Sequence, residues 1–273
     1  MATLVSNVMN SASRWIRTGC DRGHGTRIGI ALGGGFARGI AHAGVLRVFE
    51  REGIPIHAIS GVSSGAIAAA AFASGCSSFE IESGALAAQL TSVEGLGAFV
   101  MALLKQVNFE EMLIPLAIVA SDLTAGAPVI FKEKGDVLMP IRASCAYPGI
   151  FPPVRYMDHC LVDGMVAMDV PAAPLRRMGA THVVSVVLPP TEMTDPQNAQ
   201  SVVQRSFQVM TARNGSHWRR SSDVVISPDV RDSGCSTAWN SRESAQQMIE
   251  AGVRAAEAAL PQILKWISAA EAA

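Results

Sequence analysis

Three short stretches of this chain hold residue types that together could carry out acyl transfer. The first is Gly61-Val62-Ser63-Ser64-Gly65, which follows an apolar run and precedes small residues typical of a helix. This is the pattern of a nucleophile elbow, in which a tight turn pushes a serine hydroxyl clear of the backbone. Ser63 is therefore the candidate nucleophile. Two glycines around a serine also occur in ordinary turns, so the interpretation depends on the rest of the chain.

The second stretch is the glycine-rich loop over residues 33–39, Gly-Gly-Gly-Phe-Ala-Arg-Gly. Attack by a serine turns a carbonyl oxygen into an oxyanion, which needs preorganised N–H donors, and glycines let bare backbone approach it. The loop stands one β-α unit before the elbow, so we expect it on the neighbouring strand. The candidate oxyanion-loop residues are Gly33, Gly34, Gly35, Arg38 and Gly39.

The third stretch is Asp163-Gly164, which offers a carboxylate at the end of an expected hairpin. A serine nucleophile needs a base, and histidine is the usual one. None of the six histidines stands in a motif resembling that of a triad histidine. They are His24, His42, His57, His159, His182 and His217.

The elements that must position these residues follow an alternating pattern. Apolar runs over 28–32, 54–60, 114–120 and 182–188 predict buried strands, with helices over 42–49 and 66–74 between the first ones. A β-α-β-α opening implies a parallel sheet with helices on its faces. We expect one domain over 27–268, an apolar helical stretch over 79–113 acting as a lid or a layer, and a final helix ending near Ala259, before Pro261.

Composition excludes several classes of function. Half of the residues (49%) are apolar and only 16% are charged, with mean hydropathy +0.28, which suits a large interior. The 22 basic residues balance the 23 acidic ones, so nothing argues for a nucleic-acid partner. No apolar run reaches the roughly 18–20 residues that span a bilayer. The five cysteines are scattered with no Cys-x-x-Cys pair, which indicates reduced thiols of a cytoplasmic protein and no zinc site.

Residues 1–26 form a separate N-terminal segment that is amphipathic or flexible. Apolar residues over 4–16 recur at three- and four-residue spacing, which predicts a helix with one apolar face. One interpretation is an interfacial helix that makes peripheral contact with a membrane. The favoured one is a helix packed on the flank of the domain, or a partly disordered segment, because surface anchors are scarce.

The three stretches, taken together and in this order, resemble those of the patatin-like phospholipases. Residues 32–46 resemble the oxyanion loop of that family, residues 61–65 its elbow, and Asp163-Gly164 its Asp-Gly motif. Residues 144–154 are similar to the proline-rich approach to that aspartate. The likeness is greatest to the small single-domain branch related to neuropathy target esterase. It implies an α/β fold of three layers, with a central, mostly parallel sheet and helices on both faces.

The resemblance also implies an activity and its residues. The family is a family of carboxylic ester hydrolases acting on lipids, here a phospholipid or lysophospholipid, through an acyl-enzyme. It uses a Ser-Asp dyad, which maps onto Ser63 and Asp163, with Gly61, Gly65 and Gly164 as elbow and motif glycines and with no metal or cofactor. An ordinary aspartate is a weak base at neutral pH, so partial burial must raise its pKa. Arg38 then either anchors the loop or faces a lipid phosphate, and the anchoring role is favoured.

Some positions depart from the family pattern. Met165 stands where the motif has a small residue, Met168-Asp169 where it has Asn-Pro or Asn-Asn, and Phe36 at a loop position that is often small. These changes bear on the geometry of the dyad and on substrate size. They leave open a weakly active, lipid-binding relative of the family.

Two competing functions are compatible with parts of the pattern. An esterase acting on small esters with a Ser-Asp-His triad would take its base from His182 or His217. A dinucleotide-binding module also opens with a strand, a glycine loop and a helix. It is disfavoured because the spacing is Gly-x-Gly-x-x-x-Gly and the next strand ends without an acidic residue for a ribose. Nothing in the sequence indicates the oligomeric state.

Overall fold

A computed structural model describes residues 25–87, 93–189, 195–230 and 242–271. The amphipathic stretch over 4–16 lies outside the described residues, so the expectation of membrane contact through it stays a prediction. Within the described part of the chain, no helix is both long enough and apolar enough to cross a bilayer.

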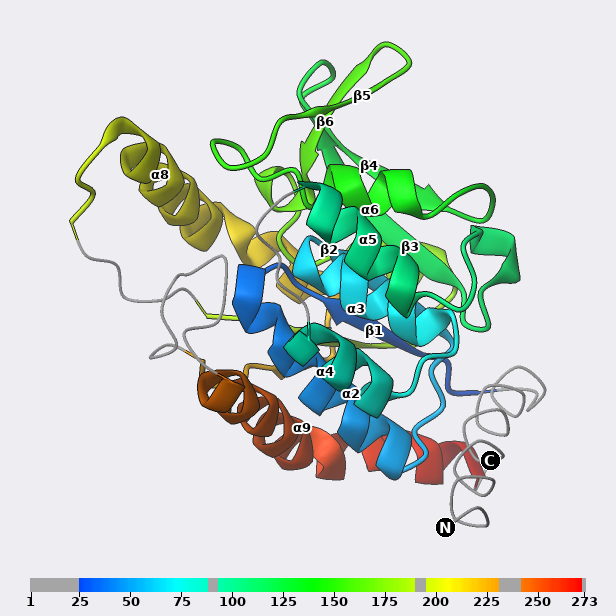
Figure 1. Cartoon of the computed structure of the whole chain (residues 1–273). Helices are drawn as coiled ribbons and strands as arrows, with labels where there is room; N and C mark the ends of the chain where they lie inside the picture. Colours follow the sequence, from blue (N-terminus) through cyan, green and yellow to red (C-terminus); the bar gives the residue numbers. More distant parts are fainter. Residues whose placement is uncertain (1–24, 88–92, 190–194, 231–241, 272–273) are drawn as a thin grey trace.

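The described residues form one eight-stranded sheet, drawn across the centre of Figure 1. Its middle is parallel: β1 (Ile28–Leu32) lies between β2 (Ala58–Val62) and β7 (His182–Val186), with β3 (Leu116–Asp122) beyond β2 and β8 (Val224–Ile226) beyond β7. The other three strands run antiparallel to their neighbours. They are β4 (Ala127–Lys132), β5 (Val154–Tyr156) and β6 (His159–Asp163).

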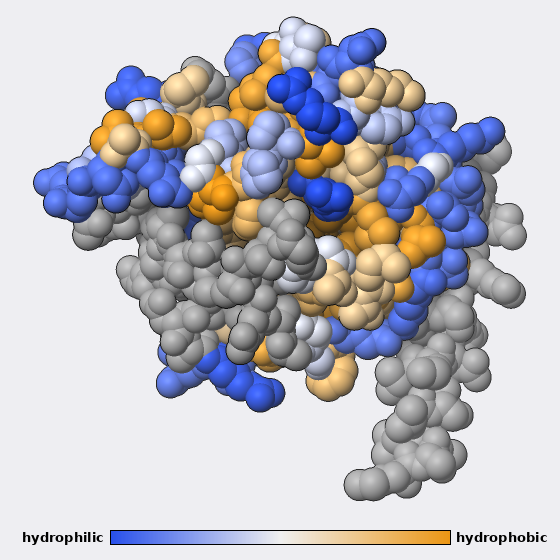
Figure 2. Space-filling view, turned by 45° about the horizontal axis from the view of Figure 1, so that its top comes forward, coloured by the Kyte–Doolittle hydropathy of each residue, from blue (hydrophilic) through white to orange (hydrophobic). Residues whose placement is uncertain are grey.

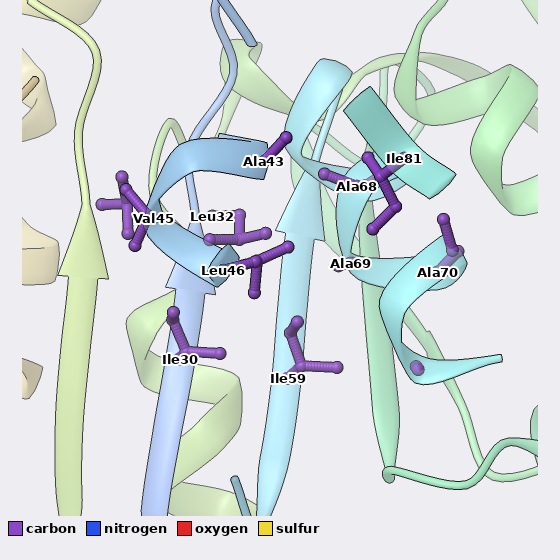
Figure 3. Packing of buried hydrophobic residues seen from close by; sticks show 14 of the residues in the cluster. Ile30, Leu32, Ala43, Val45, Leu46, Ile59, Ala68, Ala69, Ala70 and Ile81 are labelled. Carbon is purple, nitrogen blue, oxygen red and sulfur yellow. The ribbon is translucent and has the colours of Figure 1, made fainter. Parts of the chain in front are cut away.

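The central strand is apolar along its length because both of its faces are covered, as is usual for a parallel sheet. Alternate side chains point to opposite faces. Ile28, Ile30 and Leu32 pack into the larger core, together with side chains of α2 (Ala41–Arg51) and α3 (Ser64–Ala73). Figure 3 shows Ile30 and Leu32 at close range beside side chains of these two helices. Ala31 belongs to the smaller core on the other face, with residues of α7 (Ala172–Arg177).

The remaining helices complete the two outer layers. Buried residues of α4 (Ser78–Ala87), α5 (Val93–Leu103) and α9 (Arg242–Glu271) join the larger core, and Trp218 of η4 (Gly215–Ser221) joins the smaller one. The predicted α/β fold of three layers, with a mostly parallel sheet, is therefore confirmed. Shorter or peripheral helical elements are η1 (Phe36–Ile40), η2 (Phe109–Glu111), α6 (Leu138–Ser144), η3 (Gly164–Val166) and α8 (Ala199–Asn214).

The expected end of the last helix near Ala259 is wrong. Helix α9 is continuous from Arg242 to Glu271 with Pro261 inside it. Proline removes one backbone hydrogen bond and crowds the preceding turn, which costs about 3 kcal/mol in a helix interior. Ile263 is fully buried beyond it, and Trp266 and Ile267 pack against the larger core. We attribute the continuation of the helix to this apolar contact.

Candidate active site

Ser63 lies between the last residue of β2 and the first residue of α3. Its backbone has φ 55° and ψ −128°, a positive φ that is strained for any residue with a Cβ. The Ser63 amide donates a hydrogen bond to Ser144 Oγ (2.8 Å), and that hydroxyl donates to the carbonyl of Val119 (2.6 Å). Ser144 therefore ties the strained turn to the neighbouring strand.

The two elbow glycines permit backbone contacts that no side chain would allow. A Cβ on Gly61 would lie 2.3 Å from the carbonyl oxygen of Gly65, and one on Gly65 would lie 2.2 Å from that of Leu32. Both distances are well inside van der Waals contact. The first turn of α3 therefore crosses directly over the end of β1, where the glycine loop begins.

Asp163 is brought to Ser63 by the way the strands share β3. Strand β4 pairs with β3 from Ala117 to Asp122 and so occupies one edge of it. Two strands share the other edge of β3. Strand β2 pairs with it as far as Val62, which lies opposite Val119, and β6 pairs with the next residue, since Asp163 lies opposite Ala120. The end of β6 thus continues the line of β2 immediately after the elbow.

The Asp163 carboxyl is completely buried. Its Oδ1 accepts a hydrogen bond from the Met165 amide (2.9 Å), and its Oδ2 has no hydrogen-bond partner among the described residues. Burial raises the pKa of Asp163 to about 7, against the opposing effect of the Met165 amide and the Ser63 side chain. The Ser63 hydroxyl is thus near enough to favour the charged carboxylate, although no hydrogen bond of ordinary geometry joins it to Oδ2.

The glycine loop is pinned to its surroundings by backbone hydrogen bonds. The Gly33 amide donates to the carbonyl of Val186 (3.0 Å), and the Gly34 amide donates to that of Asp169 at the longer distance of 3.3 Å. Buried His42 holds the Gly33 carbonyl through its Nε2 (2.8 Å). Burial lowers the pKa of His42 to about 4, so the neutral imidazole donates this bond. These contacts fix the orientation of the Gly33–Gly34 peptide.

The end of the loop is fixed by contacts of two further predicted residues. Arg38 is almost fully buried and donates to the carbonyl of Pro189, a contact of the anchoring kind expected for it. A Cβ on Gly39 would lie 2.3 Å from Ser64 Oγ, so Gly39 lets the loop approach the start of α3. Gly35 precedes Phe36, which has φ 53° and whose ring packs on Tyr147 with centroids 4.5 Å apart.

Neither histidine proposed for a Ser-Asp-His triad lies in the cleft that contains Ser63. His182 starts β7 opposite Ile28, at the end of the sheet away from the elbow, and its ring stacks on Trp266. His217 lines a different cavity, whose wall also includes Met165. A triad is therefore not supported by either position.

The cleft beside Ser63 has about 870 Å³ of empty space, including the part open to solvent. Its lining is almost entirely apolar and comes from η1, α3, α4, α5 and the loop that holds Phe151. Figure 2 shows patches of apolar surface interspersed with polar residues across the middle of the face it presents. The stretch over 79–113, for which a lid and a layer were both expected, supplies Ile81, Ala85, Leu96, Phe99 and Leu103 to the wall.

The bulky residues that depart from the family pattern are accommodated beside the loop. A Cβ on Gly34 would lie 2.3 Å from Met165 Sδ, so the Met165 side chain packs against that glycine, while its amide holds Asp163. The Asp169 carbonyl is the partner of Gly34. No three His, Cys, Asp or Glu residues in the described part of the chain gather as a metal site would require.

The three-layer α/β fold carries a strained serine after a parallel strand, with a buried aspartate and an apolar cleft beside it. A fold and site of this kind are lipid-hydrolase-like. The chain belongs to the patatin-like phospholipase family, whose model matches residues 30–97 and 90–176. The resemblance seen in the sequence motifs is thereby confirmed.

Curated relatives match part of the chain. An uncharacterized NTE family protein of Mycobacterium bovis is 31% identical over 189 residues, which are 64% of this chain and 52% of that protein. The rat patatin-like phospholipase domain-containing protein 7 is 30% identical over 195 residues, 64% of this chain but 14% of that protein. The chain thus spans about half the length of the former and a small part of the latter.

Solved structures share the fold at low sequence identity. VipD from Legionella pneumophila superposes with a TM-score of 0.59 and 13% identity, covering 89% of this chain and 67% of that one. A human GIVD cytosolic phospholipase A2 in complex with methyl gamma-linolenyl fluorophosphonate gives a TM-score of 0.54 and 12% identity, covering 97% of this chain and 64% of that one.

Proposed function

We propose that this protein is a serine acyl hydrolase that cleaves carboxylic esters of lipids, a phospholipid or lysophospholipid, through an acyl-enzyme. The observation that carries the proposal is the buried carboxyl of Asp163, whose pKa is raised to about 7, next to the strained Ser63 at an apolar cleft. A carboxylate with a pKa near the working pH is a far better general base than an ordinary aspartate. The cleft suits a fatty acyl chain.

In the proposed reaction, Asp163 takes the hydroxyl proton of Ser63 as Ser63 Oγ attacks the ester carbonyl carbon. The oxyanion of the tetrahedral intermediate is held by amides of the glycine loop. The carbon–oxygen bond to the alcohol then breaks, and the alcohol leaves with the proton from Asp163. Water, deprotonated by Asp163, attacks the acyl-enzyme, and release of the fatty acid restores the Ser63 hydroxyl.

The donors for the oxyanion must come from amides that can turn toward Ser63. The Gly33 amide is tied to Val186, whereas the bond from Gly34 to Asp169 is long. For an oxyanion above Ser63 to replace the Asp169 carbonyl as the acceptor of Gly34, the Gly33–Gly34 peptide must rotate and release its carbonyl from His42. Losing one such donor typically costs about 3 kcal/mol in the transition state. A weakly active lipid-binding protein is the outcome if that exchange does not take place.

The test compares four proteins on p-nitrophenyl esters and on a phospholipid and a lysophospholipid: wild type, Ser63→Ala, Asp163→Asn and His182→Ala. We expect loss of hydrolysis in the first two variants and normal rates in the His182 variant, which serves as the control. Activity that survives Ser63→Ala would overturn the proposal. A cytoplasmic protein touching membranes through residues 4–16 fits this substrate, and liposome flotation with and without residues 1–26 tests that part.

A further inference from the structure

A second cavity beside the glycine loop, outside the Ser63 cleft, shares Met165, Asp169 and Trp218 with the cavity that His217 lines. It encloses about 1110 Å³ of empty space, including the part open to solvent, and Gly33, Gly34 and Met165 form the wall nearest the elbow. The reaction outlined above makes no use of it. Its position against the same loop raises the question of what it holds.

The linings of the two cavities differ in chemistry. No charged side chain is among the described residues that line the Ser63 cleft, whereas the polar lining of the second cavity includes Asp169, Arg38, Arg219 and Thr211. Burial raises the pKa of Asp169 to about 6, against hydrogen bonds from the Asp169 and Val170 amides and the weaker effects of Trp218 and Arg219, so the carboxyl is mostly ionised at neutral pH. Such a lining offers hydrogen-bond acceptors and donors to a hydroxyl-bearing molecule.

Met165 stands between this cavity and Ser63. The point where a Gly34 Cβ would lie is 2.3 Å from Met165 Sδ, 2.5 Å from Met165 Cγ and 3.2 Å from Ser63 Cβ. The thioether and the Ser63 side chain therefore both lie against the same glycine. Met165 lines the second cavity but not the Ser63 cleft, so its side chain forms part of the wall between the two.

An ester consists of an acyl half and an alcohol half, and the apolar cleft accommodates only the acyl half. We infer that the second cavity binds the alcohol half of the ester, a hydroxylated alcohol such as a glycerol unit, and that Met165 limits the size of alcohol that can reach Ser63. This inference rests on the proposed hydrolase function. A small residue at position 165 would widen the opening past Gly34 between the second cavity and Ser63.

The experiment measures kcat/KM for fatty acid release from three decanoyl esters, those of ethanol, 1-propanol and glycerol, and from a decanoyl ester of a bulky aryl alcohol. In Met165→Ala we expect the ratio of bulky to ethyl ester to rise at least tenfold, with the preference for acyl length unchanged. Met165→Leu keeps the volume and should keep the wild-type ratio. Met101→Ala, at a half-exposed methionine of α5, is the matched control.

A second variant tests the polar lining of the second cavity while leaving Met165 unchanged. In Asp169→Asn we expect the preference for the glycerol ester over the propyl ester to fall about tenfold, as loss of a charged hydrogen-bond partner would cause. The substitution keeps the backbone carbonyl of Asp169, which accepts the hydrogen bond of the Gly34 amide.

Unchanged ratios in Met165→Ala and Asp169→Asn, in proteins that melt like wild type, would overturn the inference. If Met165→Ala does not fold, the Asp169→Asn ratio alone decides it. A wild-type protein that releases no fatty acid from any ester would instead contradict the proposed function itself. A wild-type protein that hydrolyses the esters while both variants keep its selectivity would contradict only the assignment of the second cavity.

Discussion

Asp163 lies directly beyond Ser63 along one edge of β3, because β6 takes over the pairing with Ala120 at the point where β2 ends. The edge of a single strand thus aligns a nucleophile and a carboxylate that are 100 positions apart in the chain. The arrangement needs no histidine between them. It also buries the carboxyl, and that burial has consequences that can be measured.

The first consequence is the pH dependence of hydrolysis. Asp163 must be ionised to accept the proton of Ser63, and its pKa is raised to about 7. We therefore expect kcat/KM to level off above pH 8 and to fall about tenfold per pH unit well below 7. A profile on a soluble ester, with melting curves at each pH as the control, measures this. A flat profile between pH 5 and 8 would be incompatible with Asp163 as the base.

The second consequence concerns stability. The pKa of Asp163 is higher in the folded protein than in the unfolded chain, so the folded state binds more protons between about pH 4 and 7, and this group lowers stability as pH rises through that window. Asp163→Asn should therefore raise the free energy of unfolding relative to wild type at pH 8, by up to about 4 kcal/mol.

Urea unfolding of the two proteins at pH 4 and pH 8 measures this difference. The advantage of the Asp163→Asn variant should shrink toward pH 4, where the wild-type carboxyl is protonated. An advantage of the same size at both pH values would show that the ionised carboxylate is not its source.

The third prediction concerns the support of the elbow by Ser144. In Ser144→Ala the Ser63 amide loses its partner inside the protein, which should cost about 1–3 kcal/mol of stability. Hydrolysis should fall as well, because the strained turn is no longer tied to β3. Urea unfolding and kcat/KM check both effects, with Ser83→Ala at an exposed serine of α4 as the control. Equal stability of the two variants would count against this role.

The fourth prediction uses two glycines with opposite surroundings. Gly65→Ala places a methyl group 2.2 Å from the Leu32 carbonyl oxygen and should disrupt the elbow and abolish activity. Gly97→Ala in α5 meets nothing within 4 Å and should stabilise the helix by about 0.5–1 kcal/mol. Thermal melting and ester hydrolysis compare the two. A Gly65→Ala protein with normal activity would refute the close crossing of α3 over β1.

The fold and the two residues proposed for the dyad can be predicted from the sequence. Apolar runs such as the one over 28–32 mark strands buried on both faces, and alternation of strands with helices specifies a parallel sheet. The glycines around Ser63 are local signals, since each excludes a side chain from a close backbone contact.

What could not be predicted depends on contacts between distant segments. Nothing in the residues around Ser144 shows that its hydroxyl bridges Ser63 and Val119. The bulk of Met165 suggests a disturbed dyad, yet its side chain packs on Gly34 while its amide holds Asp163. The predicted end of α9 is wrong because a proline rule is local, whereas the packing of Ile263 beyond it is tertiary.

The central claim is that Ser63 forms an acyl-enzyme with Asp163 as its base. Its most direct test is intact-protein mass spectrometry after rapid acid quench of the reaction with a long-chain p-nitrophenyl ester, followed by peptide mapping. We predict an added acyl mass located on Ser63 in wild type, greatly reduced in Asp163→Asn and absent in Ser63→Ala. An acyl group on any other residue, or turnover that continues in Ser63→Ala, would contradict the claim.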